Sequence, residues 1–439
     1  MKPSTKHAAL AVAGAAAFLS IVFFEIPLLF KAPLAIASLA ACGTGIAGYT
    51  RQPGYYGLVV LRGRKGFNLM RYLASHHQRF FSEMADFGLT LFFGFLYGLA
   101  LYHKKPRKLA AHALLLGFFA FSFQFYVPGM QDLQLVLSIA GFLFGLAATF
   151  LAAIAFQAIH IAFNFQSAAP GAMPAIPGLT IPLEAIISII VLMIVHETSH
   201  GVLFFIEKLR VKSSGVLLFG FIPVGAFVEQ EEKQFERAPI TKKRRVLVAG
   251  STANFFAALA FVLLSVPVST AFASASNGAA IESVLNTSSL YGKALPGEVI
   301  TAVNGQPIKT TADLAAALQE HAPGETITLQ TTAGEKTAVL SSDSKLGITA
   351  HNAPAPGMEA LHSLLALALS VMNWTAVLNL MVALFNVMPL FITDGHLIMR
   401  EELIYRLGTK RETTAKLVAK AVGAAFLFLL LINFLPWLK

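Results

Sequence analysis

The feature of this sequence that most limits its fold is a series of long apolar stretches. A run of about 18 or more apolar residues is long enough to cross a bilayer as a helix. Since 56% of the 439 residues are hydrophobic and only 13% are charged, the chain is too apolar for a soluble globular protein. We predict a polytopic α-helical membrane protein with about nine spans, the first retained rather than cleaved as a signal peptide. The spans are expected at 8–30, 32–50, 86–103, 109–127, 134–158, 182–206, 246–270, 360–386 and 420–437.

Charge and cysteine content narrow the possible partners. The formal net charge is +10, and in a membrane protein an excess of Lys and Arg marks cytoplasmic loops and contacts with anionic lipid. We therefore expect the lipid bilayer, and no nucleic acid, among the partners. The single cysteine, Cys42, lies in an apolar run, which excludes a disulfide framework and a multi-cysteine metal site. A metal ion would have to be held by His, Asp or Glu.

The distribution of basic residues predicts the orientation of the spans. Residues 208–245 contain nine Lys or Arg, whereas residues 159–181 contain none. By the positive-inside rule, the span at 182–206 runs from the outside to the cytoplasm. Residues 51–79 and 400–420 are then also cytoplasmic. The basic loop around residues 104–108 disagrees, so the sequence leaves the topology before residue 159 open.

Residues 63–80 alternate apolar and basic side chains. Phe67, Met70, Leu73 and Phe80 recur at roughly helical spacing. This pattern predicts an amphipathic helix lying on a membrane face. A solvated basic loop is the alternative.

Residues 274–352 differ in kind from the rest of the chain. Apolar runs shorten to strand length in EVITAVNG, TITLQTT and KTAVLSS, and TADLAAALQEH has a helical pattern. The run LYGKALPGEVITAVNGQPIKTTADLAAAL resembles a PDZ domain, in which Asn304 and Gly305 would supply a tight hairpin turn. The resemblance implies a small extracytoplasmic PDZ-like α/β domain that binds an extended peptide at a sheet edge. An unrelated small α/β insert is the alternative.

A cluster of ionisable residues lies inside the span at 182–206. In VHETSHG, His196 and His200 are four residues apart, so on a helix both imidazoles lie on one face and can reach one Zn²⁺ at about 2.0–2.1 Å. Glu197 follows the first histidine, where it can act as a general base toward water. Ionisable groups deep in a span cost several kcal/mol unless they are paired or bind a metal ion. The setting therefore favours a zinc site over a polar cluster between helices.

A third ligand has to come from elsewhere, because a catalytic zinc ion usually has three protein ligands. In ALFNVMPLFITDGHLI, Pro389 interrupts an apolar helix and Asp394 lies in the disrupted stretch. Irregular backbone at membrane depth is tolerated where it lines a buried site, so Asp394 is the preferred ligand. An ordinary Asp-Gly turn is its alternative role. His396 is the rival ligand, or a partner that orients one.

Four motifs occur in the order of those in the site-2 protease family of intramembrane zinc metalloproteases, which this chain resembles over roughly residues 180–402. They are HETSH in a span, GAFVE, VLVAGSTANFF and NVMPLFITDG. The match looks most like the archaeal and eukaryotic-type branch. It implies one Zn²⁺ per chain, held by His196, His200 and Asp394, with Glu197 as the general base.

The same resemblance assigns supporting roles to further residues. Asn254 and Asn386 match asparagines that support the site or the substrate, although hydrogen bonding between helices would explain both equally well. The segment FIPVGAFVE resembles a re-entrant hairpin whose edge contacts an unwound substrate; its candidate substrate residues are Gly225, Ala226 and Phe227.

The predicted function is zinc-dependent endoproteolysis of transmembrane proteins, near the cytoplasmic side of the cell membrane. A secondary transporter and a metal-binding pseudoprotease are the alternatives. The pseudoprotease is favoured only by His396, which stands where the family often has a second glycine. The sequence does not predict the oligomeric state. The expected domains are an N-terminal membrane region (1–158), a first part of the catalytic core (159–273), the PDZ-like domain (274–352) and a second part of the core (353–439).

Overall fold

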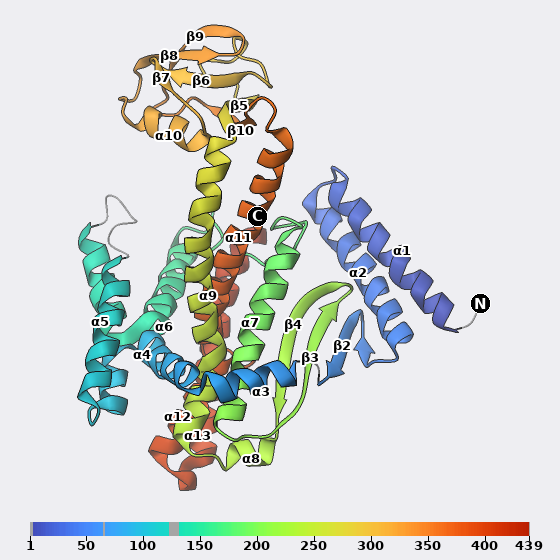
Figure 1. Cartoon of the computed structure of the whole chain (residues 1–439), viewed down its shortest axis with the longest axis vertical. Helices are drawn as coiled ribbons and strands as arrows, with labels where there is room; N and C mark the ends of the chain where they lie inside the picture. Colours follow the sequence, from blue (N-terminus) through green and yellow to red (C-terminus); the bar gives the residue numbers. More distant parts are fainter. Residues whose placement is uncertain (1–2, 65, 123–130, 439) are drawn as a thin grey trace. The chain divides into compact units, whose positions relative to one another are not determined.

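A computed structural model describes residues 3–64, 66–122 and 131–438 (Figure 1). The chain forms two compact units, one of residues Met1–Ala260 with Trp374–Lys439 and one of residues Phe261–Asn373. The elements before the insert are α1 (Pro3–Phe23), α2 (Leu28–Thr50), β1 (Gly54–Tyr55), β2 (Leu58–Gly63), α3 (Phe67–His76), α4 (Gln78–Tyr102), α5 (Pro106–Ser122), α6 (Gln131–Phe163), α7 (Ala185–Ile206), β3 (Val211–Phe219), β4 (Ile222–Gln230), α8 (Glu232–Glu236) and α9 (Ile240–Ser274). The later ones are β5 (Ser276–Val284), β6 (Val299–Val303), β7 (Gln306–Pro307), α10 (Thr311–Gln319), β8 (Thr326–Thr331), β9 (Gly334–Val339), β10 (Ile348–Pro354), α11 (Glu359–Asn386), α12 (Asp394–Leu407), η2 (Thr409–Arg411), α13 (Glu412–Phe434) and η3 (Leu435–Leu438).

Eight helices within the described residues are long and apolar enough to cross a membrane. One further expected span, at 109–127, coincides with α5. This helix has 17 residues, and the expected span extends beyond the described residues. The chain is therefore a multi-pass membrane protein, and nine spans remain a prediction. The eight segments are Thr5–Phe23, Phe30–Thr50, Gln78–Tyr102, Leu135–Phe163, Ala185–Ile206, Ile240–Ser274, Glu359–Asn386 and Thr409–Trp437.

The N-terminal part of the chain contributes two strands to the predicted hairpin. Strands β3 and β4 pair in antiparallel fashion, and β2 and then β1 continue the sheet beyond β3. The order β1-β2-β3-β4 leaves β4 at one edge. Strands β1 and β2 were not predicted, because β2 pairs with a strand about 150 residues later in the chain.

The amphipathic helix expected at 63–80 is shorter in the structure, and part of its apolar face packs against α7. Residue 63 ends β2, α3 covers Phe67–His76, and Phe80 is an exposed residue of α4. Phe67 and Met70 are buried in the protein core, where the Phe67 ring packs edge-on against Phe205 of α7. Helix α3 therefore packs these two side chains against the protein, and its position on a membrane face stays a prediction.

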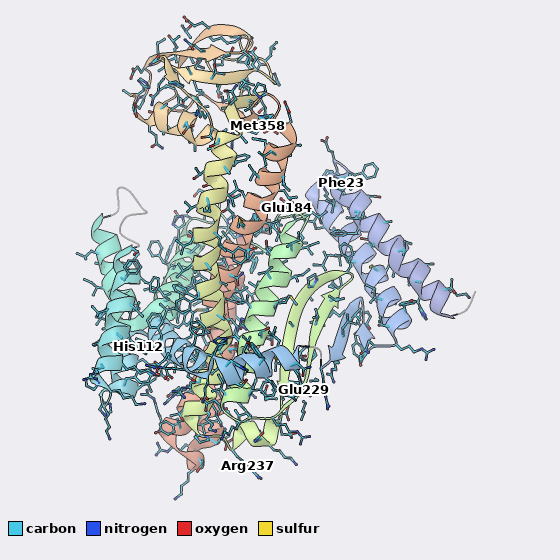
Figure 2. All side chains as sticks on the ribbon, viewed as in Figure 1. Phe23, His112, Glu184, Glu229, Arg237 and Met358 are labelled. Atoms are coloured by element: carbon cyan, nitrogen blue, oxygen red, sulfur yellow. The ribbon has the colours of Figure 1, made fainter. Side chains whose placement is uncertain are left out.

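Helix α7 is central to the first unit. Glu184 is its N-cap residue, and Arg237, just after α8, lies near the opposite end of the helix (Figure 2). Ile187, Ile190 and Ile194 form an exposed stripe at helical spacing, which suits contact with lipid. The remaining faces of α7 pack against other helices and against β4.

The second unit holds a six-stranded antiparallel sheet and α10. The path β10-β5-β6-β8-β9 carries β7 as an extra partner of β6. Strands β6, β8 and β9 and helix α10 confirm the sequence prediction, whereas β5 and β10 were not predicted. Thr310 and Asp313 form a capping box that begins α10. Asn304 and Gly305 both have positive φ in the turn from β6 to β7, as expected for a tight hairpin.

Candidate metal centre

Three ligand atoms from two distant segments converge in the first unit. His196 and His200 lie one turn apart on α7, and Asp394 begins α12. The two Nε2 atoms are 3.1 Å apart, and Asp394 Oδ2 lies 3.5 Å from His196 Nε2 and 3.0 Å from His200 Nε2. Tetrahedral zinc with bonds of about 2.0–2.1 Å separates its ligand atoms by roughly 3.3 Å. The three atoms thus have the chemistry and spacing of a zinc site.

Helix α9 fixes the orientation of both imidazoles. His200 Nδ1 lies 2.7 Å from the carbonyl oxygen of Val246, so Nδ1–H donates to this oxygen and Nε2 keeps its lone pair for a metal ion. The Asn254 amide lies 3.0 Å from His196 Nδ1 through its Nδ2 atom, and its Oδ1 has no hydrogen-bond partner among the described residues. A half-turn of this amide lets Oδ1 accept a hydrogen bond from His196 Nδ1–H, which leaves His196 Nε2 for the metal ion as well.

A glycine lets α9 approach the two rings. A Cβ atom at Gly250 would lie 2.4 Å from His200 Nε2 and 2.5 Å from His196 Nε2, too close for any side chain. Nearby, the Ser199 hydroxyl donates to the carbonyl of Ala249 at 3.2 Å. Gly250 was not among the predicted site residues. Its position four residues before Asn254, within VLVAGSTANFF, was the available signal.

Asp394 is held at the break between α11 and α12. Helix α11 ends at Asn386, whose Nδ2 donates to Asp394 Oδ2 at 2.5 Å and lies 3.1 Å from His196 Nε2. Thr393 is the N-cap of α12, with its hydroxyl oxygen accepting from the backbone of His396 at 3.4 Å. Asp394 thus lies in the first turn of a helix, where a carboxylate is stabilised by the helix dipole.

Glu197 lies next to His196 on α7 and is half-buried. Adjacent residues of a helix point about 100° apart, so the Glu197 carboxylate lies beside the ligand cluster rather than within it. Within the described residues, no hydrogen bond or ion pair holds this carboxylate.

Other predicted residues lie apart from the ligand cluster. His396 is buried, its ring packs against Phe391 with centroids 5.5 Å apart, and it is not part of the metal-binding group. Gly225, Ala226 and Phe227 are in β4, opposite residues 215–217 of β3. Ala226 packs against an apolar cluster that includes Leu192 and Met193 of α7, about one turn from the histidines.

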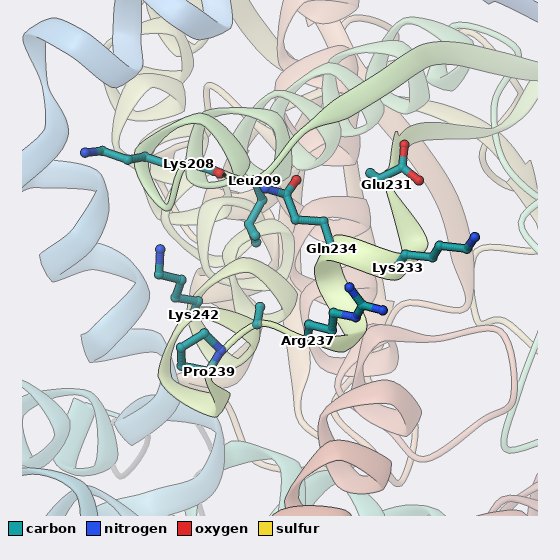
Figure 3. Close-up of a pocket in the computed structure, with 9 residues that line it drawn as sticks. Lys208, Leu209, Glu231, Lys233, Gln234, Arg237, Pro239 and Lys242 are labelled. Atoms are coloured by element: carbon teal, nitrogen blue, oxygen red, sulfur yellow. Dashed lines mark hydrogen bonds between the residues drawn. The ribbon is translucent and has the colours of Figure 1, made fainter.

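A basic surface pocket of about 460 Å³ lies away from the metal-binding group, between the end of α7, α8 and the start of α9 (Figure 3). Lys208, Lys233, Arg237 and Lys242 line it together with Glu231. Lys208 and Lys233 point in opposite directions. The basic side chains do not point toward a common position, so the pocket lacks the geometry of an anion-binding site.

Comparison with known proteins gives one family and one relative. The model of peptidase family M50 matches residues 184–430, more than half of the chain and the whole stretch from α7 to α12. An uncharacterized protein of Methanocaldococcus jannaschii is 28% identical over 227 residues, which cover 51% of this chain and 56% of that protein. This chain therefore matches little more than half the length of the archaeal relative.

Proposed function

The chain belongs to peptidase family M50, and from that premise we propose that it is a zinc-dependent endopeptidase that cuts transmembrane proteins, as site-2 proteases do. Family membership supports a membrane metallopeptidase. The observation that carries the finer proposal is the convergence of His196, His200 and Asp394 in a multi-pass membrane protein.

The residues present suit one zinc ion per chain. Two imidazole nitrogens and one carboxylate oxygen are common ligands of catalytic zinc, and three protein ligands leave a fourth position open. The Val246 carbonyl holds His200 in the tautomer that presents Nε2 to the ion. A bound zinc ion would supply Lewis acidity, which lowers the pKa of water and polarises the scissile carbonyl.

Glu197 supplies the proton transfer in this proposal. Its carboxylate takes a proton from the attacking water and passes it to the nitrogen of the leaving amine. Asn386 lies against both Asp394 and His196, so it keeps these two ligands in position. Its amide can also donate to a substrate carbonyl once the ligands are bound to metal.

Strand β4 is the proposed substrate-binding edge. It is the last strand of its sheet, and Ala226 packs beside α7. A substrate segment added to this edge would extend alongside the helix that holds the histidines. The scissile peptide must first leave its helical hydrogen bonds, which favours substrates that contain Gly or Pro near the cut.

The proposed orientation places the site toward the cytoplasmic half of the cell membrane. Lys208, Arg210, Lys233 and Arg237 are exposed near the end of α7, and exposed basic residues favour the cytoplasmic side. The insert is then extracytoplasmic. We propose that it is PDZ-like and acts as a filter against substrates with long external domains.

Cleavage of single-span reporter proteins in proteoliposomes tests the proposal, with bound zinc measured in every sample. Wild-type protein should cut a reporter, and Glu197→Gln should hold the same zinc but not cut. Glu25→Gln, a matched change at an exposed residue between α1 and α2, should cut like the wild type. Cleavage by Glu197→Gln at the wild-type rate would exclude the assigned base, and zinc without any cleavage in wild-type protein would favour the pseudoprotease.

A further inference from the structure

Four consecutive basic residues, Lys242 to Arg245, lie in the first turns of α9, and the structure places them between other helices. Lys243 and Arg244 are each only 8% exposed. In the sequence alone, all four count among the basic residues of a cytoplasmic loop. Successive residues of a helix point about 100° apart, so four residues in a row reach every side of the helix.

Two members of this run hold α9 to α7 and α4. Lys242 Nζ donates to the carbonyl of Glu207, just after α7, at 2.6 Å. Arg245 makes two hydrogen bonds of 2.7 Å to the carboxylate of Asp86 in α4, and a third of 3.1 Å to the Glu207 carboxylate. These contacts lie away from α12.

The other two members pair with adjacent residues of α12. Lys243 Nζ lies 2.7 Å from Glu401 Oε2, and Arg244 Nε donates to Glu402 Oε1. The Tyr97 hydroxyl of α4 also donates to Glu402, at 2.5 Å. Both carboxylates are largely buried, and a buried charge that loses a partner destabilises the fold.

The spacing of these pairs matches the spacing of the metal centre on both helices. Gly250, which touches both imidazoles, lies seven residues after Lys243 on α9. Asp394, the third ligand, lies seven residues before Glu401 on α12. Seven residues make nearly two helical turns and about 10.5 Å, so on each helix the ion pair and the metal-site residue share one face. The ion pair and the metal-site residue are therefore equally far apart along the two helices.

We infer that the ion pairs Lys243–Glu401 and Arg244–Glu402 position the metal centre by fixing the height and rotation of α12 against α9. Two neighbouring pairs define rotation as well as height, because turning α12 by one residue would separate each buried carboxylate from its cation on α9. Only the arginines of α12 itself, Arg400 beside Glu401 and Arg406 beside Glu402, would turn with it. The position of Asp394 Oδ2 relative to the imidazoles then follows from contacts about two turns away. The inference rests on the proposed function only in requiring that His196, His200 and Asp394 bind a metal ion.

Binding of Co²⁺ to the full-length protein in detergent tests this role. The affinity is measured by competition with a chelator, and the visible absorption spectrum reports the geometry around the ion. Glu401→Gln should weaken binding roughly 10- to 100-fold, as loss of a residue that orients a ligand commonly does, and should change the spectrum. The charge-swapped double variant Lys243→Glu with Glu401→Lys should bind Co²⁺ more tightly than Lys243→Glu alone, in which two carboxylates face each other.

Asp86→Asn is the matched control. It breaks a pair that is buried to a similar degree, with carboxylate side chains 4% exposed at Asp86 and 8% at Glu401, and its partner Arg245 lies in the same turn of α9. It should lower the unfolding temperature but leave Co²⁺ affinity and spectrum unchanged. Equal effects of Asp86→Asn and Glu401→Gln on the metal site would overturn the inference, as would wild-type binding by a folded Glu401→Gln protein.

Two further results separate the possible failures. If Glu401→Gln does not fold, Glu401→Asp keeps the charge on a shorter side chain and should still shift the spectrum; an unshifted spectrum would count against the inference. If wild-type protein binds Co²⁺ no better than His200→Ala, the proposed metal site itself is wrong and the positioning role falls with it. If wild-type protein binds Co²⁺ strongly, and His200→Ala abolishes this binding while Glu401→Gln leaves it unchanged, only the positioning role is refuted.

Discussion

The metal-centre region buries polar side chains within an apolar core, whereas the core of the insert is a cluster of apolar side chains. The insert core includes Ile300 and Leu329, as in a protein that folds in water. Around the metal centre, His200 of α7 and Asn254 of α9 are buried, whereas Ile194 of α7 is 58% exposed. Between membrane helices, polar contacts and close packing replace the hydrophobic effect as the main source of specificity. We therefore expect replacement of polar residues to abolish function in the first region, and replacement of apolar residues to reduce stability in the second.

The largest expected effect follows from His200→Ala. It removes one of three ligands, so bound zinc and reporter cleavage should both fall to background. Hydrogen exchange within residues 276–354 should not change. His321→Ala, which changes a histidine of the insert paired with Glu325, should leave zinc and cleavage intact. Retained zinc in His200→Ala would contradict the assignment of His200 as a zinc ligand.

Leu329→Ala should have the opposite outcome. Leu329 is fully buried in the insert, and removal of such a side chain costs about 2–5 kcal/mol of unfolding free energy. Hydrogen exchange should accelerate throughout the β6 and β8 strands, while zinc content stays at the wild-type level. A parallel loss of zinc would indicate that the two regions do not behave independently.

Gly250→Ala tests the close approach of α9 to the two imidazoles of the metal centre. The added methyl group would lie about 2.4 Å from His200 Nε2, and overpacking of this kind costs about 1–3 kcal/mol. The dissociation constant for zinc should rise by roughly ten- to a hundredfold. Gly117→Ala in α5 is the control: a new Cβ there would lie 3.9 Å from the Phe142 ring, an ordinary contact distance, so this variant should bind zinc normally. Normal binding by Gly250→Ala would mean that α9 does not press against the rings.

The smallest expected effect concerns Glu298 in the insert. Burial of this carboxyl opposes ionisation, but hydrogen bonds from Lys336 and from the Leu295 backbone outweigh it and lower the pKa of Glu298. A lowered pKa stabilises the folded state above the ordinary glutamate value of about 4.3, and this contribution disappears as the pH falls through the lowered value. Thermal unfolding of the insert between about pH 5 and pH 3 measures it. The Glu298→Gln variant should lose part of that pH dependence, and an identical profile would rule out this contribution.

Local features of the site were predictable from the sequence. The four-residue spacing of His196 and His200 places both rings on one helix face whatever surrounds them. Pro389 marked the break before Asp394, and the structure has α11 ending at Asn386 and α12 beginning at Asp394. The strands of the insert with clear alternation were predicted as well.

Contacts made by the backbone or by distant segments were not predictable. The Val246 carbonyl that orients His200 has no signal in residue identity, since every residue carries a carbonyl group. The basic run Lys242–Arg245 was interpreted as loop charge because its carboxylate partners lie far away in the sequence. The adjacent pair Glu401 and Glu402 was the one available hint, since it complements the adjacent pair Lys243 and Arg244.

X-ray absorption by zinc bound to the purified full-length protein reports which atoms surround the ion. We predict one zinc ion per chain with two imidazole nitrogens and a carboxylate oxygen at about 2.0–2.2 Å. Asp394→Ala should reduce the zinc content strongly in a protein that remains folded. An unchanged zinc content and spectrum in Asp394→Ala, or a spectrum without imidazole, would contradict the claim that α7 and α12 together hold the ion.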